Sequence, residues 1–358
     1  MEAINAKKKL KSFLAAVVKR DASDLHLAVD RHPTIRVDGK LIPITEEDVL
    51  TASDTKLISN VLIGAKDRAA FEDKGHIGFS FPFEKGARFR VNVFLQKGNV
   101  GIVMRLVQTD IRTLEELNID PGLYDFAKFS QGLVLITGPV GHGKSTTMAA
   151  MVDYINHNYN KHIITVEDPI EYVYEQDQCI INQREVGGDV KSFPSALRAV
   201  FREDANVVLI GELRDLDTIS TTMTAAETGH LIFGTLHTNN SAQTIDRIVD
   251  VFPAHQQNQI RSQLSSVLLG VVSQRLVPKI GGGRIPAIEV LIKNHAIENL
   301  IRENRAYQID SVIETSLQDG MISLDRSLSQ LVQKGLITME DAFTFSNNRD
   351  YLKTIIKQ

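Results

Sequence analysis

Between Gly138 and Ser145 the chain reads GPVGHGKS, a spacing of glycine, lysine and serine that suits the binding of phosphate. It fits the pattern G-x-x-x-x-G-K-[ST], in which glycines let successive backbone N–H groups converge on a phosphate. A helix that follows the loop adds partial positive charge at its N-terminus. Lys144 is then expected to reach the β- and γ-phosphates, and the Ser145 hydroxyl to bind Mg²⁺. We therefore predict a nucleotide site formed by Gly138, Pro139, Val140, Gly141, His142, Gly143, Lys144, Ser145 and Thr146.

His142 is the unusual residue in this loop. Because the backbone and Lys144 hold the phosphate, we expect the His142 side chain to point away from it, towards solvent or a neighbouring subunit. The alternative is a modulating role, in which a protonated His142 tightens nucleotide binding below about pH 6.5.

Glu212 follows the apolar run NVVLI after one glycine. The second signature of a phosphate-loop hydrolase usually ends in two acidic residues, and here Gly211 takes the first of these places. Glu212 is therefore the candidate general base that activates water. The alternative is a carboxylate that caps the next helix or pairs with Arg214.

Glu167 and Asp168 end a second apolar run, in the stretch TVEDPIEY. Doubly wound sheets bind their ligands beyond such strand ends. Glu167 is the candidate organiser of water or Mg²⁺, and the alternatives are helix capping or an ion pair.

His230 and His237 bracket the short strand in GHLIFGTLHTN. They lie at opposite ends of that strand, so they are not expected to ligate one metal ion. From the residues alone, a structural role and a nucleotide-sensing role both remain open.

Strands and helices must alternate to position these residues. Continuous apolar runs predict buried strands of the parallel type, and helical patterns separate them. The predicted strands are GLVLIT, HIITVED, NVVLIG and HLIFGTL. The first predicted helix follows the phosphate loop and ends at about Asn158, and two more helices are predicted at PSALRAVFRE and DLDTISTTMTAAET. The tail from Ser241 is mostly helical, with two strands around Gly281-Gly282-Gly283. The predicted class is α/β, doubly wound.

Residues 1–105 predict a separate α+β domain with an antiparallel sheet. Hairpin signals lie at Asp38-Gly39, Lys85-Gly86 and Lys97-Gly98. Residues 106–122 are the predicted linker, and residues 123–358 form the second domain with its helical C-terminal region. Residues 4–19 predict an amphipathic helix whose apolar face packs on its own domain, the alternative being a helix on a membrane. That face contains Leu10, Phe13, Leu14, Val17 and Val18.

Composition narrows the classes of function. The 358 residues favour two domains, and a net charge of −4 gives no general attraction to nucleic acid. The single cysteine, Cys179, excludes an internal disulfide and a cysteine-built zinc site. No apolar run has the length of a membrane span, so we expect a cytoplasmic protein.

Together these motifs resemble the secretion ATPase superfamily. Four boxes occur in its order: the phosphate loop, TVEDPIEYVY, LIGELRD and TGHLIFGTLHTN. The resemblance implies a hexameric ring of RecA-like ATP-hydrolysing domains, each preceded by a PAS-like domain. It implies Glu212 as base, Glu167 as an active-site acid, and His230 and His237 as sensors. It also implies arginines that complete the site, with Arg90, Arg105, Arg198 and Arg202 as the candidates.

Within this superfamily the chain resembles the type IV pilus retraction ATPases. It lacks the four-cysteine zinc insertion and the long N-terminal domains that are usual in the pilus-extension and type II secretion relatives. The resemblance implies an inner-membrane pilus platform protein and a paralogous pilus ATPase as partners, and a position at the inner face of the cytoplasmic membrane. Three departures from the family pattern are His142, where a small residue is usual, residues 203–206, where EDAN replaces EDPD, and Glu298, where AIENLIRE replaces AIRNLIRE.

Two other functions remain open at this point. One is an accessory ring subunit that binds nucleotide without efficient turnover, although Lys144 and Glu212 argue against it. The other is a nucleic-acid motor, which the acidic balance and the absence of a basic stripe with aromatic residues disfavour.

Overall fold

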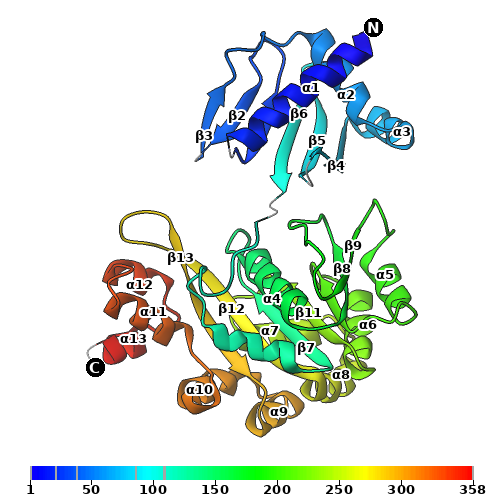
Figure 1. Cartoon of the computed structure of the whole chain (residues 1–358). Coiled ribbons are helices and arrows are strands. Elements are labelled where there is room, and N and C mark those ends of the chain that lie inside the picture. Colours follow the sequence, from blue (N-terminus) through cyan, green and yellow to red (C-terminus); the bar gives the residue numbers. More distant parts are fainter. Residues whose placement is uncertain (1, 21, 38, 85–86, 108–109, 357–358) are drawn as a thin grey trace. The chain divides into compact units, whose positions relative to one another are not determined.

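The structure is a computed structural model that describes residues 2–20, 22–37, 39–84, 87–107 and 110–356. The chain divides into two compact units (Figure 1). The first contains residues 1–110 and 169–173, and the second contains residues 111–168 and 174–358. None of the helices in the described ranges is both long enough and apolar enough to span a bilayer.

The first unit is an antiparallel sheet with helices packed against it. Its strands occur in the order β3-β2-β1-β6-β5-β4. Helix α1 lies across one face of this sheet, next to α2 (Figure 1). The strands are β1 (Asp24–Leu27), β2 (Thr34–Val37), β3 (Lys40–Pro43), β4 (His76–Pro82), β5 (Arg88–Gln96) and β6 (Asn99–Val107), and the helices are α1 (Glu2–Lys19), α2 (Ala52–Leu62) and α3 (Ala65–Lys74).

The predicted hairpins can be compared with this sheet. β2 pairs with β3 around Gly39 as expected, although Asp38 lies outside the described residues. The turn between β5 and β6 has positive φ at both Lys97 and Gly98, the backbone that a two-residue hairpin requires. The Lys85-Gly86 turn and residues 108–109 of the predicted linker also lie outside the described residues.

Helix α1 packs on its own domain, as predicted. Leu10, Phe13, Leu14 and Val17 are buried in the core of this unit. The prediction for Val18 is wrong, because its side chain is exposed. One helical step rotates Val18 by about 100° from Val17, which turns it off the buried face.

The second unit contains a seven-stranded sheet in the order β13-β12-β7-β11-β10-β8-β9. All neighbouring strands are parallel except β12 and β13, which form the predicted hairpin around the three glycines. The strands are β7 (Gly132–Thr137), β8 (His162–Glu167), β9 (Ile180–Glu185), β10 (Val207–Ile210), β11 (Leu231–Leu236), β12 (Leu268–Pro278) and β13 (Arg284–Ile292). Strand β9 is absent from the predicted set because four of the six residues of this edge strand, IINQRE, are polar.

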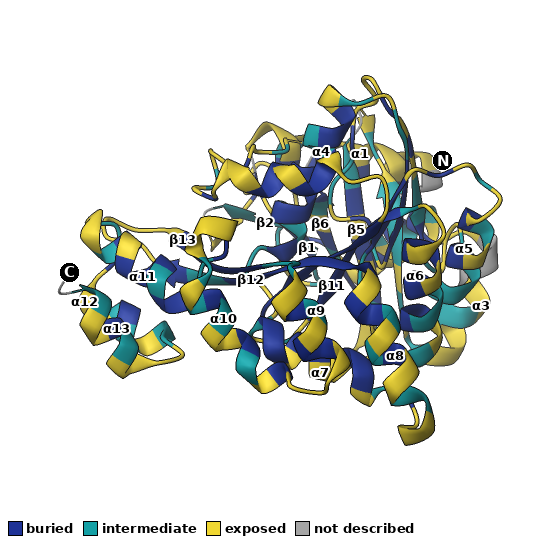
Figure 2. Cartoon of the chain, turned by 90° about the horizontal axis from the view of Figure 1, so that it is seen from below, coloured by how far each residue is buried: buried dark blue, intermediate teal, exposed yellow. Residues whose placement is uncertain are grey.

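Helices pack against this sheet, as expected of a doubly wound α/β domain. They are α4 (Lys144–Asn158), α5 (Phe193–Val200), α6 (Leu216–Glu227), α7 (Ser241–Asp250), α8 (Ala254–Val267) and α9 (His295–Arg302), with the 3₁₀ segment η2 (Pro121–Lys128) before β7. Buried residues follow the strands, and exposed residues lie on the outer faces of helices such as α8 (Figure 2).

The C-terminal region is helical, as predicted. It contains α10 (Ile309–Thr315), α11 (Leu324–Gln333), α12 (Met339–Phe345) and α13 (Arg349–Ile356), and the last three share a small core with the β12–β13 hairpin. A buried carboxylate ties this hairpin to α7. Glu289 on β13 accepts hydrogen bonds from the backbone N–H and the hydroxyl of Ser241, at 2.8 and 2.7 Å, in the first turn of α7.

Candidate nucleotide site

Four parallel strands end at one edge of the second sheet. Strands β7, β10 and β11 are buried along their whole length, because their apolar runs face helices on both sides. The phosphate loop, Glu167, Glu212 and His237 follow the ends of β7, β8, β10 and β11. The topology therefore collects them at the carboxyl edge of the sheet, where such folds bind ligands.

The phosphate loop leads into a helix whose first turn carries no side-chain cap. Gly143 is the N-cap of α4, and this position makes no side-chain cap hydrogen bond. By contrast, Ser192, Asp215 and Asn240 cap α5, α6 and α7 with their side chains. Uncapped N–H groups and the helix dipole suit a phosphate, so this terminus fits the predicted ligand.

Strand β12 passes so close to the loop that a Cβ atom at either of two glycine positions would collide with Gln274. A Cβ atom would lie 2.2 Å from the Gln274 carbonyl oxygen at Gly138, and 2.7 Å from Gln274 Nε2 at Gly143. Both glycines also have positive φ. The Gln274 side chain bridges the loop and α4, because Nε2 donates to the His142 carbonyl at 2.8 Å and Oε1 accepts from Thr147 at 2.7 Å.

Lys144 lies at the centre of the cluster and is buried. Its Nζ donates to the carbonyl oxygens of Gly138 and Pro139, at 2.7 and 3.0 Å. The same atom lies 3.1 Å from Nδ1 of His237. Ser145 and Thr146 occupy the first turn of α4 next to it.

Glu212 joins this cluster through His237. Its Oε1 lies 3.2 Å from His237 Nε2, and its Oε2 lies 2.7 Å from Arg214 Nη2. The capping alternative for Glu212 does not hold, because Asp215 caps α6. The predicted ion pair with Arg214 is present, but it uses only Oε2 of Glu212. The other oxygen, Oε1, stays in contact with the His237 imidazole.

The charge state of Glu212 follows from these neighbours. Burial raises the pKa of this carboxyl, but the hydrogen bond from Arg214 and the charges of His237 and Arg214 outweigh that effect and hold the pKa below its ordinary value. Glu212 is therefore ionised at neutral pH and able to accept a proton. The backbone beside it is fixed, since Leu213 N–H donates to the Thr235 carbonyl at 3.0 Å and the Thr235 hydroxyl donates to the Gly211 carbonyl.

Glu167 lies buried at the end of β8, adjacent to the end of β10. A Cβ atom on Gly211 would lie 3.3 Å from the Glu167 Cα. The carboxylate accepts from the Thr165 hydroxyl at 2.6 Å. Helix capping does not apply, because the next helix after Glu167 begins at Phe193.

Mg²⁺ would have few ligands from the protein itself. Within the described part of the chain, no three His, Cys, Asp or Glu side chains form a cluster that could hold a metal ion. Mg²⁺ commonly keeps water and binds through substrate phosphates. The Ser145 hydroxyl, with Glu167 at the same sheet edge, fits that mode of binding better than a protein-only cage.

His230 and Arg202 do not join the cluster. His230 precedes the amino end of β11, as expected from its position opposite His237. Its Nδ1 lies 3.1 Å from the Ala225 carbonyl and its ring packs edge-to-face on Phe201. Arg202 is exposed in the turn after α5 on the same side. Within one chain, neither residue lies at the carboxyl edge, and the contacts of His230 fit the structural alternative.

Arg90 and Arg105 belong to the first unit. They pair directly across β5 and β6 and are both exposed, so they share one face of that sheet. Arg105 Nε also lies 2.8 Å from Asp24 Oδ1, and Arg36 approaches the other oxygen of that carboxylate at 3.6 Å.

The sequence and structure match known secretion ATPases. Residues 2–284 match the model of the family described as Type II/IV secretion system protein. The chain is 48% identical over 330 residues to the Type IV pilus retractation ATPase PilT of Pseudomonas aeruginosa, covering 92% of this chain and 96% of that protein. It is 43% identical to a twitching motility protein of Neisseria gonorrhoeae, over 89% of this chain and 85% of that one.

The fold agrees with these relatives. The crystal structure of the pilus retraction motor PilT with bound ADP aligns with a TM-score of 0.89 and 44% identity, over 96% of this chain and 98% of that one. The chain belongs to the Type II/IV secretion system protein family. Within this family it is a PilT-like ATPase.

Two residues that hold the phosphate loop of this ATPase are missing from the sequence-based prediction. Gln274 bridges the loop and α4, and Arg284 on β13 donates to the Gly141 carbonyl at 3.3 Å. The only sequence signal for Gln274 was a polar pair, Ser273-Gln274, inside an apolar strand. The prediction that the His142 side chain points towards solvent or a neighbouring subunit is also wrong, because its ring turns towards β12, where Nδ1 accepts from the Leu276 N–H at 3.0 Å.

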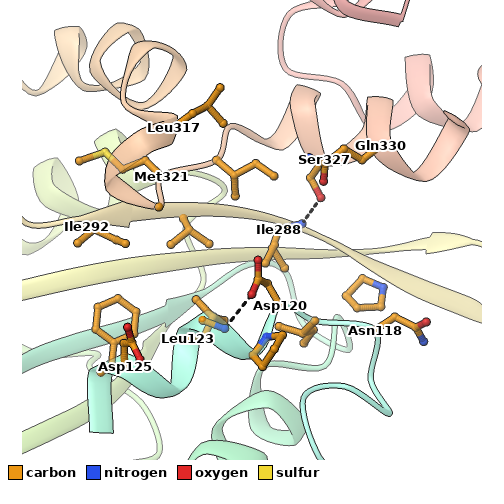
Figure 3. Close-up of a pocket in the computed structure, with 18 of the residues that line it drawn as sticks. Asn118, Asp120, Leu123, Asp125, Ile288, Ile292, Leu317, Met321, Ser327 and Gln330 are labelled. Atoms are coloured by element: carbon orange, nitrogen blue, oxygen red, sulfur yellow. Dashed lines mark hydrogen bonds between the residues drawn. The ribbon is translucent and has the colours of Figure 1, made fainter. Parts of the chain in front are cut away.

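The secretion ATPase also has a pocket that contains none of these residues. It has a volume of about 1020 Å³ and lies between η2, the face of β13 and the segment around α11 (Figure 3). Its lining is mainly apolar, with Leu123, Ile288, Ile292 and Met321 among the residues that surround it. The candidate catalytic residues lie in the carboxyl-edge cluster and not in this pocket.

Proposed function

We propose that this chain hydrolyses ATP to drive the retraction of a type IV pilus. The observation that carries the proposal is the link from the phosphate loop to the candidate base: Lys144 contacts His237, and His237 contacts Glu212. The similarity to a pilus retraction ATPase supplies the coupling to a pilus.

In the proposed reaction the first turn of α4 binds the phosphates through its backbone N–H groups, and Lys144 takes up charge that develops on the γ-phosphate. Glu212, ionised and held by Arg214 and His237, accepts a proton from the attacking water. Mg²⁺, held by Ser145 with Glu167 ordering its water ligands, would neutralise phosphate charge when bound. His237 contacts both Lys144 and Glu212, so it can relay loss of the γ-phosphate to the β11–α7 loop.

The working unit in this proposal is a homohexameric ring. Residues 1–105 form a PAS-like domain, residues 106–122 a linker and residues 123–358 a RecA-like ATPase domain. Because His230 and Arg202 lie away from the carboxyl edge of their own chain, they are proposed to act at subunit contacts, together with Arg198 in the last turn of α5. Arg90 and Arg105 are proposed to complete the nucleotide site from the first domain.

The proposed partners are those that the resemblance to pilus retraction ATPases implies. The ring engages an inner-membrane pilus platform protein and works beside a paralogous pilus ATPase, at the inner face of the cytoplasmic membrane. No nucleic acid takes part. ATP turnover by the purified chain that does not respond to DNA is the expected result, and DNA-stimulated hydrolysis would contradict it.

The decisive test is deletion in the host, complemented by the wild-type chain or by Glu212→Gln. Surplus surface pili without twitching motility are expected in the deletion and in the strain complemented by the variant. Glu340→Gln, an exposed glutamate on α12, is the matched control and should restore twitching. A bald cell would instead indicate pilus extension.

A further inference from the structure

Strand β12 extends past the end of its parallel neighbour. The last residue of β7, Thr137, pairs with Ser273, and the two hydroxyls hydrogen-bond at 2.9 Å. β12 then continues to Pro278. Along this extension β12 runs beside the phosphate loop, and the Leu276 N–H donates to a loop side chain.

The hairpin β12–β13 makes three hydrogen bonds to residues 141 and 142 of the loop. Leu276 N–H donates to the His142 imidazole at Nδ1, 3.0 Å away, and Gln274 Nε2 donates to the His142 carbonyl at 2.8 Å. Arg284 donates to the Gly141 carbonyl at 3.3 Å. Only one of the three accepting groups is a side chain, and that side chain is His142.

We propose that His142 is a positioning residue, whose neutral imidazole seats the phosphate loop against β12 in the shape that binds phosphate. The proposal deepens the nucleotide-binding function proposed above and rests on it. The ring does not contact the nucleotide; it acts through the backbone of residues 141–143. A serine or alanine at this position is too short to reach the Leu276 N–H.

The direction of the hydrogen bond determines the protonation state. A backbone N–H can only donate, so Nδ1 must carry a lone pair and the neutral ring must carry its proton on Nε2. A protonated ring has no acceptor and would direct an N–H towards another N–H.

The surroundings of His142 favour the neutral ring. Burial lowers the pKa of His142, and the positive charges of Arg284 on β13, Lys144 on α4 and Arg275 on β12 lower it further. Acidification to the point where the ring protonates is therefore expected to release the loop. This is the opposite sign from the tightening that a protonated histidine beside a phosphate would give.

The test compares His142→Asn with His142→Ala. The Oδ1 atom of asparagine can occupy the place of Nδ1 and accept from Leu276, but it does not titrate; alanine removes the acceptor. The affinity for MgADP is measured by isothermal titration calorimetry from pH 7.5 to pH 5. We expect the Asn variant to bind about fivefold to tenfold more tightly than the Ala variant at pH 7.5, as befits one hydrogen bond to a buried donor. We expect wild-type affinity to fall relative to the Asn variant at the acid end.

Two outcomes would overturn the proposal. These are equal affinities for the Asn and Ala variants, or wild-type and Asn profiles that stay parallel over the whole range. Titration of the nucleotide affects both proteins equally, so it cancels in the ratio of the wild-type affinity to the affinity of the Asn variant. This comparison also keeps the test valid if the Ala variant does not fold. If wild type does not bind MgADP at all, the proposed nucleotide function fails. If wild type binds but the two variants do not differ, only the role of His142 fails.

Discussion

The imidazole of His237 lies between Glu212 and the phosphate loop, with Nε2 3.2 Å from Glu212 Oε1. Its other nitrogen, Nδ1, lies 3.1 Å from Lys144 Nζ. One ring thus connects the residue proposed to accept a proton with the residue proposed to hold the γ-phosphate. The three side chains are expected to respond together when either partner changes.

Replacing the proposed base tests this assignment directly. Glu212→Gln keeps the size of the side chain but cannot accept a proton, so we expect ATP turnover to fall about 10²- to 10⁴-fold. MgADP affinity should change little, because α4 and Lys144 bind the phosphates. Turnover is measured by phosphate release, with Glu340→Gln as control. A wild-type rate in the Glu212→Gln variant would remove this carboxylate from the mechanism.

Arg214 is expected to set the acid limb of the pH–rate profile. Its hydrogen bond and charge lower the pKa of Glu212, so Arg214→Ala should raise that pKa. A general base with a higher pKa becomes protonated, and so inactive, at a higher pH as the solution is acidified. We therefore expect the acid limb of kcat/KM to move up by about one pH unit. Arg68→Ala, which removes an exposed arginine of α3, is the control. An unchanged acid limb would show that Glu212 does not govern it.

The packing of β12 against the loop predicts different effects for two glycines of similar backbone. Gly141 and Gly143 have φ of +76° and +83°, but only Gly143 would place a Cβ near another group, 2.7 Å from Gln274 Nε2. Both alanine variants carry the backbone strain, and only Gly143→Ala must also displace Gln274. We expect MgADP affinity to be about tenfold weaker for Gly143→Ala than for Gly141→Ala. Equal affinities would mean that Gln274 moves without affecting the loop.

Glu289 is expected to make stability depend on pH. Burial raises its pKa to about 7 in spite of the Ser241 hydrogen bonds, so the folded chain holds this proton at a pH where the unfolded chain has lost it. The free energy of unfolding should therefore fall as pH rises from about 4.5 to 7, by as much as about 3 kcal/mol at 1.36 kcal/mol for each pKa unit.

The variant Glu289→Gln isolates this contribution. Glutamine still accepts from Ser241 but has no proton to lose, so its unfolding free energy should fall less over the same range. Urea unfolding at pH 5 and pH 7.5 measures the difference, again beside Glu340→Gln. Parallel slopes for wild type and Glu289→Gln would contradict the prediction.

Much of the second unit could be predicted, because its strands and the functional residues at their ends are indicated by short stretches of neighbouring residues. Short apolar runs indicated the strands, and acidic residues or a histidine directly after them indicated Glu167, Glu212 and His237. Their meeting at one edge follows from parallel strands alone. The same locality indicated the β2–β3 hairpin and the buried face of α1.

Contacts between distant segments could not be predicted. His142 and Leu276 are 134 residues apart, and Gln274 meets Thr147 across 127 residues. No periodicity shows which polar residue of one strand will face a loop that follows another. The contact of Glu298 in the first turn of α9 is local by contrast: it pairs with Lys293 at 3.1 Å, a reason for glutamate where the retraction branch usually has arginine.

The uncapped start of α4 has a consequence for the lifetime of the protein. Ser192, Asp215 and Asn240 complete the first turns of α5, α6 and α7 with their side chains, whereas in the proposed nucleotide site a bound phosphate completes the first turn of α4. A nucleotide present at about a hundred times its dissociation constant would add about 2.7 kcal/mol to the stability of the folded chain. Resistance to proteolysis should therefore rise and fall with the nucleotide concentration, so that the protein is degraded faster when nucleotide is scarce.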